Sequence, residues 1–185
     1  MPVILRDATT ADIASIAAIY RESVGNGTAS FEIDPPTDAE MATRFSGITG
    51  QGYPYLAAVN GAGNVIGYAY ASAFRTRPAY RWMVEDSIYL AAESRGHGIG
   101  KALLAALLER SSALGFRQMI AVIGGGHPAS VALHRAAGFS ETGLLIGTGY
   151  KHGRWLDTML MQKALGDGNV THPDLSGYPA TLFGG

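Results

Sequence analysis

The chain has 185 residues, 47% of them hydrophobic, and its fourteen basic and fifteen acidic side chains give a formal net charge of −1. This length fits a single domain with a core and room for a cleft. The charge lacks the basic excess that binding to a phosphate backbone needs, so no nucleic-acid partner is expected. The sequence has no cysteine, which excludes a disulfide framework, a thiolate metal cluster and a sulfur nucleophile.

No stretch of the sequence approaches the roughly 18 apolar residues that a membrane span requires, and the N-terminus turns polar at once. We therefore expect a protein without a membrane partner that works in the cytoplasm. No metal site is expected.

The first fifty residues predict one strand followed by two helices. Residues 3–6 form a short β-prone run, and Thr10 is suited to cap a helix after it. Residues 25–36 are rich in turn formers and predict a loop. Thr37 and Glu40 have the spacing of a capping box, which predicts the start of a second helix. The first helix should bury one apolar face, made of Ile13, Ile16, Ala17 and Tyr20.

Three strands are predicted in the middle of the chain. Residues 55–59 and 65–71 are β-prone runs, and the segment between them is rich in glycine and asparagine, which tolerate positive φ. These runs predict a hairpin. Residues 84–90 predict a further strand, which leads into a glycine-rich turn.

Helices and strands alternate in the second half of the sequence. A helix is expected over residues 99–114, with Gly115 as its left-handed cap, and an apolar strand over residues 118–123. The next helix opens near Pro128. Large apolar residues alternate over 155–165, which predicts the last strand.

No repeat or linker divides the chain, so residues 1–165 are expected to form a single domain. Residues 166–185 are rich in glycine and proline, and we expect a C-terminal extension that is either mobile or packed onto the domain. Antiparallel strands that lead into a β-α-β crossover indicate a mixed α/β architecture.

The segment from Arg95 to Lys101 has the features of a phosphate-binding turn. It follows a strand and opens a helix, whose N-terminus offers unpaired N–H groups and a partial positive charge. Gly96, Gly98 and Gly100 let the backbone approach an anion, and the two basic side chains add charge at either end. By its spacing alone, the segment fits a plain strand-to-helix connection equally well.

Two other phosphate motifs fail on these residues. A P-loop needs a glycine five positions before Gly100 and a hydroxyl residue after Lys101, where the chain has Arg95 and Ala102. A dinucleotide fingerprint needs the spacing G-x-G-x-x-G in the first β-α unit, with an acidic residue about 20 positions later. The glycines here run G-x-G-x-G late in the chain, and Glu109 is too close to them.

The remaining pattern, Arg-x-x-Gly-x-Gly after a strand, resembles the acyl-CoA motif of the GNAT acetyltransferase superfamily. This resemblance implies the GNAT fold, an α/β (α+β) fold with a mixed, mostly antiparallel central sheet, a splayed parallel strand pair and helices on both faces. Within the superfamily, residues 3–163 are most similar to the phosphinothricin and methionine sulfoximine N-acetyltransferases. The matching stretches are residues 19–20, 28–31, 74–81, 84–90, 129–134, 138–139, 151–157 and 161–162.

The resemblance implies that acetyl-CoA is the cosubstrate. Backbone at the end of the strand that precedes the turn should pair with the pantetheine amides, because this strand separates from its neighbour in the GNAT fold. Ser130 and His134 lie one helical turn apart, so both should reach the thiol end. His127 stands where many relatives have a cofactor-binding asparagine, and its imidazole could still donate a hydrogen bond. The expected contacts are Ile88, Tyr89, Leu90, Arg95, Gly96, His97, Gly98, Ile99, Gly100, Lys101, His127 and Ser130.

N-acetylation requires a neutral amine, so a carboxylate near the thioester should accept a proton from an ammonium substrate. The resemblance assigns this role to Glu85, and the alternative is a strand carboxylate that faces solvent or forms an ion pair. Asp86 should point to the opposite face of a regular strand. His134 stands where many relatives have a tyrosine, so it is the candidate proton donor to the thiolate, and a structural histidine fits equally well. We expect direct attack in a ternary complex.

Three arginines cluster in the segment before Glu85, and guanidinium groups grip carboxylates or phosphinates through paired hydrogen bonds. A solvated basic loop is the alternative. The resemblance implies acetylation of the α-amino group of phosphinothricin (glufosinate), methionine sulfoximine or methionine sulfone, an activity of the herbicide-resistance type. The expected substrate contacts are Phe31, Phe74, Arg75, Thr76, Arg77, Arg81, Glu85, Asp86 and Ser87.

Two other functions remain open at this point. The acceptor could be another small amine or a peptide N-terminus, although the arginines argue against a polycation. The chain could also be a non-catalytic acyl-CoA-binding module. Relatives form homodimers in which the loop around Phe31 approaches the neighbouring site, so the resemblance also implies a homodimer.

Overall fold

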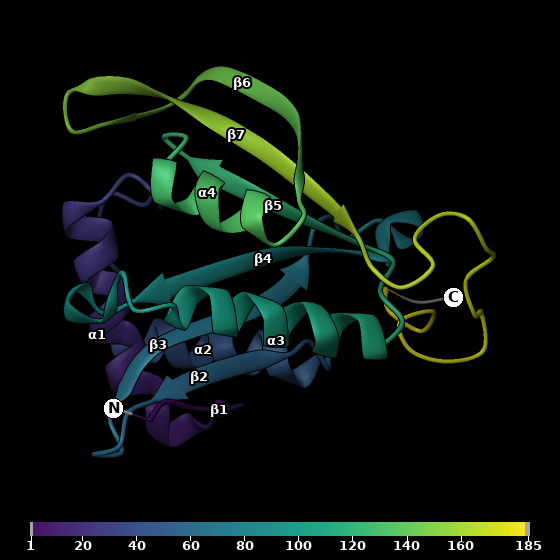
Figure 1. Ribbon diagram of the computed structural model, residues 1–185, viewed down its shortest axis with the longest axis horizontal. Helices are drawn as coiled ribbons and strands as arrows, with labels where there is room; N and C mark the ends of the chain where they lie inside the picture. Colours follow the sequence, from purple (N-terminus) through teal and green to yellow (C-terminus); the bar gives the residue numbers. More distant parts are fainter. Residues whose placement is uncertain (1, 184–185) are drawn as a thin grey trace.

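The computed structural model describes residues 2–183, which form one seven-stranded sheet with helices on both faces (Figure 1). The sheet has the order β1-β2-β3-β4-β5-β7-β6, and every neighbouring pair except β4–β5 is antiparallel. This confirms the predicted fold class. The strands are β1 (Ile4–Asp7), β2 (Tyr55–Val59), β3 (Val65–Ala73), β4 (Met83–Leu90), β5 (Gln118–Gly124), β6 (Ser140–Lys151) and β7 (Arg154–Ala164). The α-helices are α1 (Ile13–Asn26), α2 (Asp38–Gly50), α3 (Ile99–Ala113) and α4 (Pro128–Ala136).

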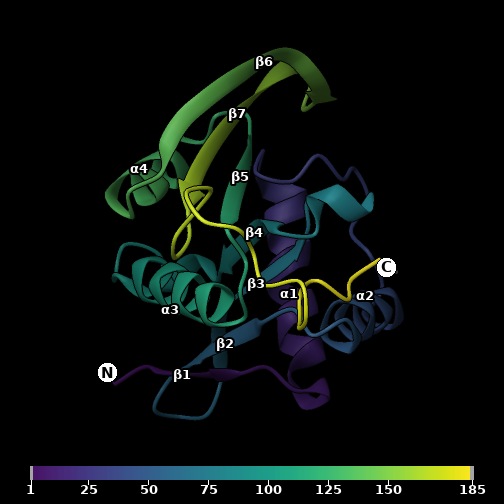
Figure 2. The same ribbon diagram turned by 90° about the vertical axis from the view of Figure 1, so that its right-hand side faces the viewer.

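The helices form two layers around the sheet. Helices α1 and α2 lie on one face, and α3 and α4 lie on the other (Figure 2). The larger core packs α3 residues such as Leu103 and Leu107 against the central strands. The smaller core joins α1 and α2 to tyrosines of β2 and β3. The predicted apolar face of α1 is confirmed, since Ile13, Ile16, Ala17 and Tyr20 are all buried.

The parallel strands β4 and β5 pair over only three residues, from Met83 opposite Gln118 to Glu85 opposite Ile120. Beyond these residues β4 continues to Leu90 and β5 continues to Gly124, but the two strands no longer pair with each other. The predicted splay is therefore confirmed. It leaves the last residues of β4 bonded to β3 on one side, while their backbone groups on the other side face the gap between the strands.

Two local predictions about helix starts have different outcomes. The capping box is confirmed, because the Thr37 hydroxyl accepts from the Glu40 amide at 3.2 Å and the Glu40 carboxylate accepts from the Thr37 amide at 2.7 Å. The predicted cap at Thr10 is wrong by one residue. A 3₁₀ turn over Thr10–Asp12 precedes α1, and its N-cap is Thr9. The Asp12 carboxylate accepts from the Thr9 amide at 2.7 Å, which fixes this junction.

Strand β6, whose twelve residues pair with β7 to form the last hairpin, is not among the predicted strands. Its residues are mostly exposed and include Gly143, Gly147 and Gly149. Its pairing register shifts twice, so the alternation that marks a regular strand is broken. The strand exists because β7 offers a partner edge, which a local pattern does not report.

The described part of the C-terminal extension packs onto the domain and loops past the starts of β4 and β5 (Figure 1). Pro179 is fully buried, and Ala180 and Leu182 are 7% and 8% exposed. The ring of Tyr178 packs edge-on against Phe116, with 5.6 Å between the ring centroids. Residues 184–185 of the predicted extension lie outside the described residues. No helix in the described chain is long and apolar enough to cross a membrane.

Candidate active site

A cleft of about 450 Å³ lies where β4 and β5 separate, next to the glycine-rich turn. Four elements supply its walls: the end of α1 with its following loop, the end of β4, the turn before α3, and the first turns of α4. The lining residues are Glu22, Ser23, Asn26, Gly27, Ala29, Ile88, Tyr89, Leu90, Arg95, Gly96, Gly98, Gly100, Lys101, His127, Ala129, Ser130 and Leu133.

The turn at the start of α3 presents backbone N–H groups to this cleft. Gly96 and Gly98 both have a φ of +79°, a conformation that side chains disfavour, and Gly98 is the N-cap of the helix. The first hydrogen bond of the helix runs from the Ala102 amide to the Gly98 carbonyl, so the amides of residues 99–101 have no hydrogen-bond partner within the helix. Those amides, the helix dipole and the Lys101 ammonium suit a pyrophosphate group.

Arg95 closes one end of the turn. Its guanidinium donates to the Leu90 carbonyl at 3.3 Å and forms an ion pair with Glu22 at the end of α1. Both side chains are partly exposed. A bound anion in the cleft would therefore compete with Glu22 for this guanidinium, and Arg95 would link α1, β4 and the turn around it.

Beyond Glu85, β4 offers a free backbone edge to the same cleft. Ile88, Tyr89 and Leu90 line it, and their ladder bonds run to β3 on the other side. An extended ligand with amide groups can add to such an edge as a strand would. The cleft thus joins an anion site at the turn to an amide-binding edge in the splay, which suits the pyrophosphate and pantetheine of acyl-CoA.

A buried hydrogen-bonded group lies behind the cleft, under α4. His134 is 3% exposed and Asp86 is 7% exposed, and the imidazole Nε2 lies 2.9 Å from the Asp86 carboxylate. The other ring nitrogen, Nδ1, lies 2.8 Å from the Ser130 carbonyl and 3.4 Å from the Ser130 hydroxyl. Ser130 itself lines the cleft, so it stands between His134 and any thiol bound there.

The geometry fixes the proton count of this pair. A carbonyl oxygen only accepts hydrogen bonds, so Nδ1 of His134 carries a proton. The contact with Asp86 then needs a second proton between Nε2 and the carboxylate. Burial lowers the pKa of His134, but the hydrogen bond and charge of Asp86 and the Ser130 carbonyl outweigh it and raise this pKa overall. The pair therefore stores a proton close to the cleft.

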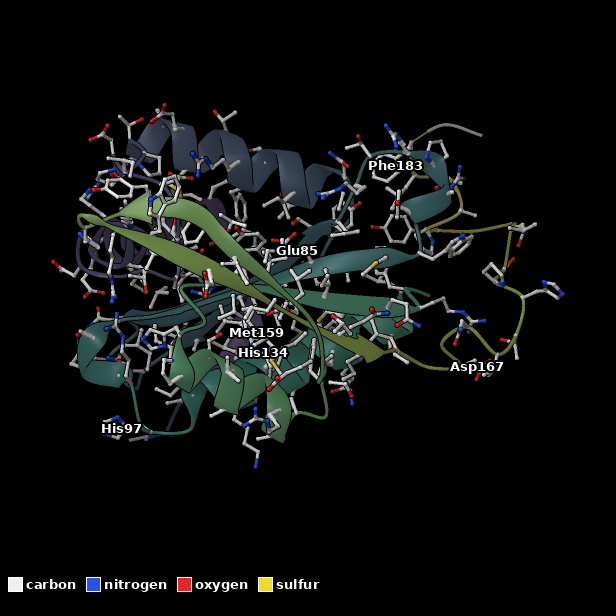
Figure 3. The ribbon with its side chains drawn as sticks, turned by 90° about the horizontal axis from the view of Figure 1, so that it is seen from above. Glu85, His97, His134, Met159, Asp167 and Phe183 are labelled. Carbon is white, nitrogen blue, oxygen red and sulfur yellow. The ribbon has the colours of Figure 1, made fainter. Side chains whose placement is uncertain are left out.

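Glu85 lies on the opposite face of β4, toward α1 and α2, at the last position where the strand pairs with β5 (Figure 3). Burial and the neighbouring Asp86 charge raise the pKa of Glu85 to about 7, although Arg75 lowers it in part. Within the described residues, no hydrogen bond to its carboxylate is formed. A carboxylate with this pKa accepts protons efficiently at neutral pH.

A second cleft of about 780 Å³ opens on the α2 face, beside Glu85. Tyr70 and Ser72 of β3 line it, and Ser72 stands directly opposite Glu85 in the β3–β4 register, on the same face. Thr76 lines the cleft as well. Glu85 is not in the lining of either cleft; it lies where β4 and β5 begin to separate, across from Ser72 of the second cleft. The remaining lining residues are Arg44, Gly47, Ile48, Gln51, Tyr53, Ala73, Thr181, Leu182 and Phe183.

Comparison with known proteins agrees with this geometry. The model of the acetyltransferase (GNAT) domain matches residues 5–160. The chain belongs to the GNAT acetyltransferase family. The phosphinothricin N-acetyltransferase of Alcaligenes faecalis is 46% identical over 164 residues, which cover 88% of this chain and 83% of the relative. The L-methionine sulfoximine/L-methionine sulfone acetyltransferase of Pseudomonas paraeruginosa is 43% identical over 162 residues, which cover 88% and 94%.

A solved structure extends the likeness to the whole chain. The GNAT phosphinothricin acetyltransferase of Sinorhizobium meliloti, crystallised in complex with AcCoA, is 63% identical, with a TM-score of 0.98 and full coverage of both chains. The present chain is thus a GNAT acetyltransferase that uses acetyl-CoA.

In this acetyltransferase, ten of the twelve expected cofactor contacts line the first cleft. The two others, His97 and Ile99, do not. Ile99 is 7% exposed and packs in the larger core, and His97 is exposed at the outer side of the turn (Figure 3). The sequence does not predict the contribution of Glu22, Ser23 and Asn26 at the end of α1, because these residues lie about 70 positions before the turn and carry no motif of their own.

The expected substrate contacts are more scattered in this acetyltransferase. Thr76 lines the second cleft, and Arg75 lies near enough to Glu85 to lower its pKa. Arg77 is exposed. The Arg81 guanidinium donates to the Ala180 carbonyl of the C-terminal extension, and its Nε donates to the Pro78 carbonyl at 2.7 Å.

Of the nine expected substrate contacts, only Thr76 lines the second cleft, and two of the others, Asp86 and Phe31, are packed against different parts of the fold. Asp86 points to the α4 side and is buried against His134, as the strand alternation predicts, so it does not reach this cleft. Phe31 packs tightly within its own chain against β5 and β6. A Cβ at Gly149 would meet its ring at 2.5 Å, and one at Gly124 would meet it at 2.9 Å.

Proposed function

We propose that this enzyme acetylates the α-amino group of phosphinothricin, methionine sulfoximine or methionine sulfone by direct transfer from acetyl-CoA. The observation that carries the proposal is the position of Glu85, a carboxylate with a pKa of about 7 that lies where β4 and β5 begin to separate, across from Ser72 of the second cleft. Relatives at 43–46% identity are named for these acceptors, which supports their assignment here. Herbicide resistance through phosphinothricin acetylation is part of the proposal.

In the proposed reaction, the Glu85 side chain and the free backbone edge of β4 have different roles. Glu85 takes a proton from the acceptor ammonium, directly or through water, and the neutral amine attacks the thioester carbonyl carbon. The C–N bond forms, the attacking nitrogen loses its second proton to water, the C–S bond breaks, and the thiolate leaves. The backbone edge at Ile88–Leu90 holds the reacting arm in place, which converts the encounter of two substrates into an oriented reaction.

His134 is the proposed proton source for the leaving thiolate. It is not in the wall of the cleft, so the proton passes through the hydroxyl of Ser130. The present separation of 3.4 Å is too long for a strong hydrogen bond, and transfer requires the hydroxyl to move closer. A thiol has a pKa of about 8.5, so this step assists turnover near neutral pH without being essential.

Arg75 is the proposed partner of the carboxylate or phosphinate of the acceptor. Its guanidinium stacks over the Phe74 ring at 4.6 Å and forms no ion pair within the described residues, which leaves it available to an anion near Glu85. Phe31, Ser87 and Arg77 remain predicted contacts from the resemblance.

A homodimer and a cytoplasmic location complete the proposal. The β6–β7 hairpin ends the sheet and exposes large apolar side chains, among them Ile146 at 81% and Trp155 at 69%. An exposed apolar patch on a sheet edge favours association. The cytoplasmic location rests on the sequence alone.

The test is a screen for CoA release from acetyl-CoA across a panel of amines. Methionine sulfone, methionine sulfoximine and phosphinothricin should each release CoA, while a polyamine and a peptide with a free N-terminus should release little. N-acetylated methionine sulfone is the matched control, because its amine is blocked. Faster release with the polyamine or the peptide would reassign the acceptor, and acetyl-CoA binding without release by any amine would indicate a binding module.

A further inference from the structure

The end of the C-terminal extension forms part of the second cleft. Thr181, Leu182 and Phe183 line it together with residues of α2 and β3. Phe183 and Glu85 both lie on the α2 side of the sheet, whereas His134 lies on the α4 side (Figure 3). A segment about one hundred residues further along the chain than Glu85 therefore contributes a wall beside the reacting centre.

Buried side chains and hydrogen bonds hold the extension against the rest of the domain. Leu182 belongs to the larger core, and its amide donates to the Pro179 carbonyl at 3.0 Å. The Arg81 side chain donates to the Ala180 carbonyl. Further back in the extension, the Arg117 guanidinium donates to the Thr171 carbonyl at 3.0 Å. Burial and hydrogen bonds thus fix the extension at several points before it reaches the cleft.

The two sides of the cleft differ in chemistry. Ser72, which stands opposite Glu85 in the register, and Thr76 after the end of β3 supply hydroxyl groups to the lining. Leu182 and Phe183 of the extension supply apolar groups, and Arg44, Ile48 and Gln51 complete the lining from α2 and its end. An amino acid whose amine lies at Glu85 therefore has its polar groups near β3 and the far end of its side chain toward the extension.

We propose that Leu182 and Phe183 are specificity-determining residues, which contact the apolar end of the acceptor side chain and limit its length. The inference rests on the proposed function, since it takes an α-amino acid as the acceptor. It adds a determinant from the extension to a site whose predicted contacts all precede residue 88. A methyl-ended side chain, such as that of methionine sulfone, meets an apolar surface there, and a longer end meets the Phe183 ring.

Kinetics with two matched acceptors test this wall. Methionine sulfone and its S-ethyl homologue differ only in the terminal group. Phe183→Ala should raise the KM for methionine sulfone about tenfold, because the methyl group loses its apolar contact. The same variant should reduce or reverse the preference of the enzyme for methionine sulfone over the ethyl homologue. Turnover at saturation and the KM for acetyl-CoA should change less than twofold. Phe183→Trp should have the opposite effect and raise the KM for the ethyl homologue more than the KM for methionine sulfone.

Leu175→Ala is the matched control, because Leu175 lies in the same extension, is 79% exposed and does not line the cleft. It should leave both KM values unchanged. Unchanged acceptor KM values in both Phe183 variants, with melting temperatures like that of the parent, would overturn the inference. If the parent releases CoA only with another amine, the proposed function fails. The same variants are then compared with that amine as the acceptor. An unaltered KM for that amine would overturn the proposed role of Leu182 and Phe183 independently of the proposed function.

Discussion

Glu85 and Asp86 are adjacent carboxylates with different surroundings. Glu85 lies on the α2 side of the sheet (Figure 3) without a hydrogen-bonded partner among the described residues, and burial and the Asp86 charge raise its pKa to about 7. Asp86 faces the other way and holds His134. Strand alternation alone predicts that the two side chains point to opposite faces. It does not predict the partner of Asp86, because His134 lies 48 positions away and only the packing of α4 against the sheet brings them together.

Replacing Glu85 tests its role as the base. Glu85→Gln should lower turnover by about a hundredfold at pH 8, since general-base catalysis contributes on that order, with acetyl-CoA affinity unchanged. In the parent enzyme, turnover should rise as the pH passes through about 7, because only the ionised carboxylate accepts a proton. The pH profile of kcat measures both effects. Glu109→Gln, an exposed change on α3, is the control, and parent-like turnover in the Glu85 variant would remove the assigned role.

The same substitution has a consequence for stability. The pKa of Glu85 is higher in the folded state than in the unfolded chain, so the carboxyl favours folding when protonated and loses that contribution as the pH rises through about 7. Glu85→Gln should therefore be more stable than the parent at pH 8, by about 1 to 3 kcal/mol, and equally stable near pH 4. Urea unfolding at the two pH values measures the difference, and equal stability at both would contradict the buried-carboxylate account.

We propose that Asp86 is a positioning residue that acts through His134. Asp86 raises the pKa of His134, so Asp86→Asn should lower this pKa and move the alkaline limb of the kcat profile to lower pH. A purely structural role would reduce stability but leave the position of the limb unchanged. The pH dependence of kcat decides between them, and direct titration of the His134 ring by NMR gives an independent reading.

At the scale of elements, the sequence predicts most of the helices and strands because their local signals agree with their packing. The capping box at Thr37, the β2–β3 hairpin and the turn before α3 are examples. The exceptions have tertiary causes. Strand β6 depends on its partner β7, and the start of α1 is shifted by the interaction of Asp12 with Thr9 and Arg6.

We expect the turn before α3 to bind the pyrophosphate of acetyl-CoA through its backbone, so its conformation should matter more than its side chains. Gly98→Ala places a side chain at a φ of +79° in open space, so its cost is conformational, about 1 kcal/mol. It should also weaken acetyl-CoA binding several-fold by turning the amides away. Gly63→Ala is the control, because Gly63 has a φ of +86°, also in open space, in the β2–β3 turn. Calorimetry should show the affinity loss in the Gly98 variant only, and an equal affinity in both would contradict the backbone role.

At the scale of the whole molecule, the sheet brings together groups from distant parts of the chain. The acyl-CoA cleft combines the end of α1 with β4, the turn and α4, and the second cleft combines α2 and β3 with the extension. The sequence motifs predict the turn and the strand that carry the chemistry. They do not predict the walls, because α1 and the extension contribute through packing and carry no phosphate-binding or catalytic pattern.

The proposed homodimer is tested at the β6–β7 hairpin. Trp155 is 69% exposed and packs against the ring of Tyr150. Trp155→Glu should keep the fold, because the side chain is not in the core, and should convert a dimer into a monomer by placing a charge in the apolar patch. Light scattering after size-exclusion chromatography measures the mass. A monomeric parent enzyme, or a variant that remains dimeric, would contradict the interface.

The central claim is acetyl transfer from acetyl-CoA to the α-amine of an amino acid in the second cleft. The most direct measurement is mass spectrometry of the products formed from isotope-labelled acetyl-CoA and methionine sulfone. The account predicts one labelled acetyl group on the α-nitrogen for each CoA released, in the parent enzyme and at a much lower rate in Glu85→Gln. Release of CoA without acetylated methionine sulfone, or no release at all, would contradict it.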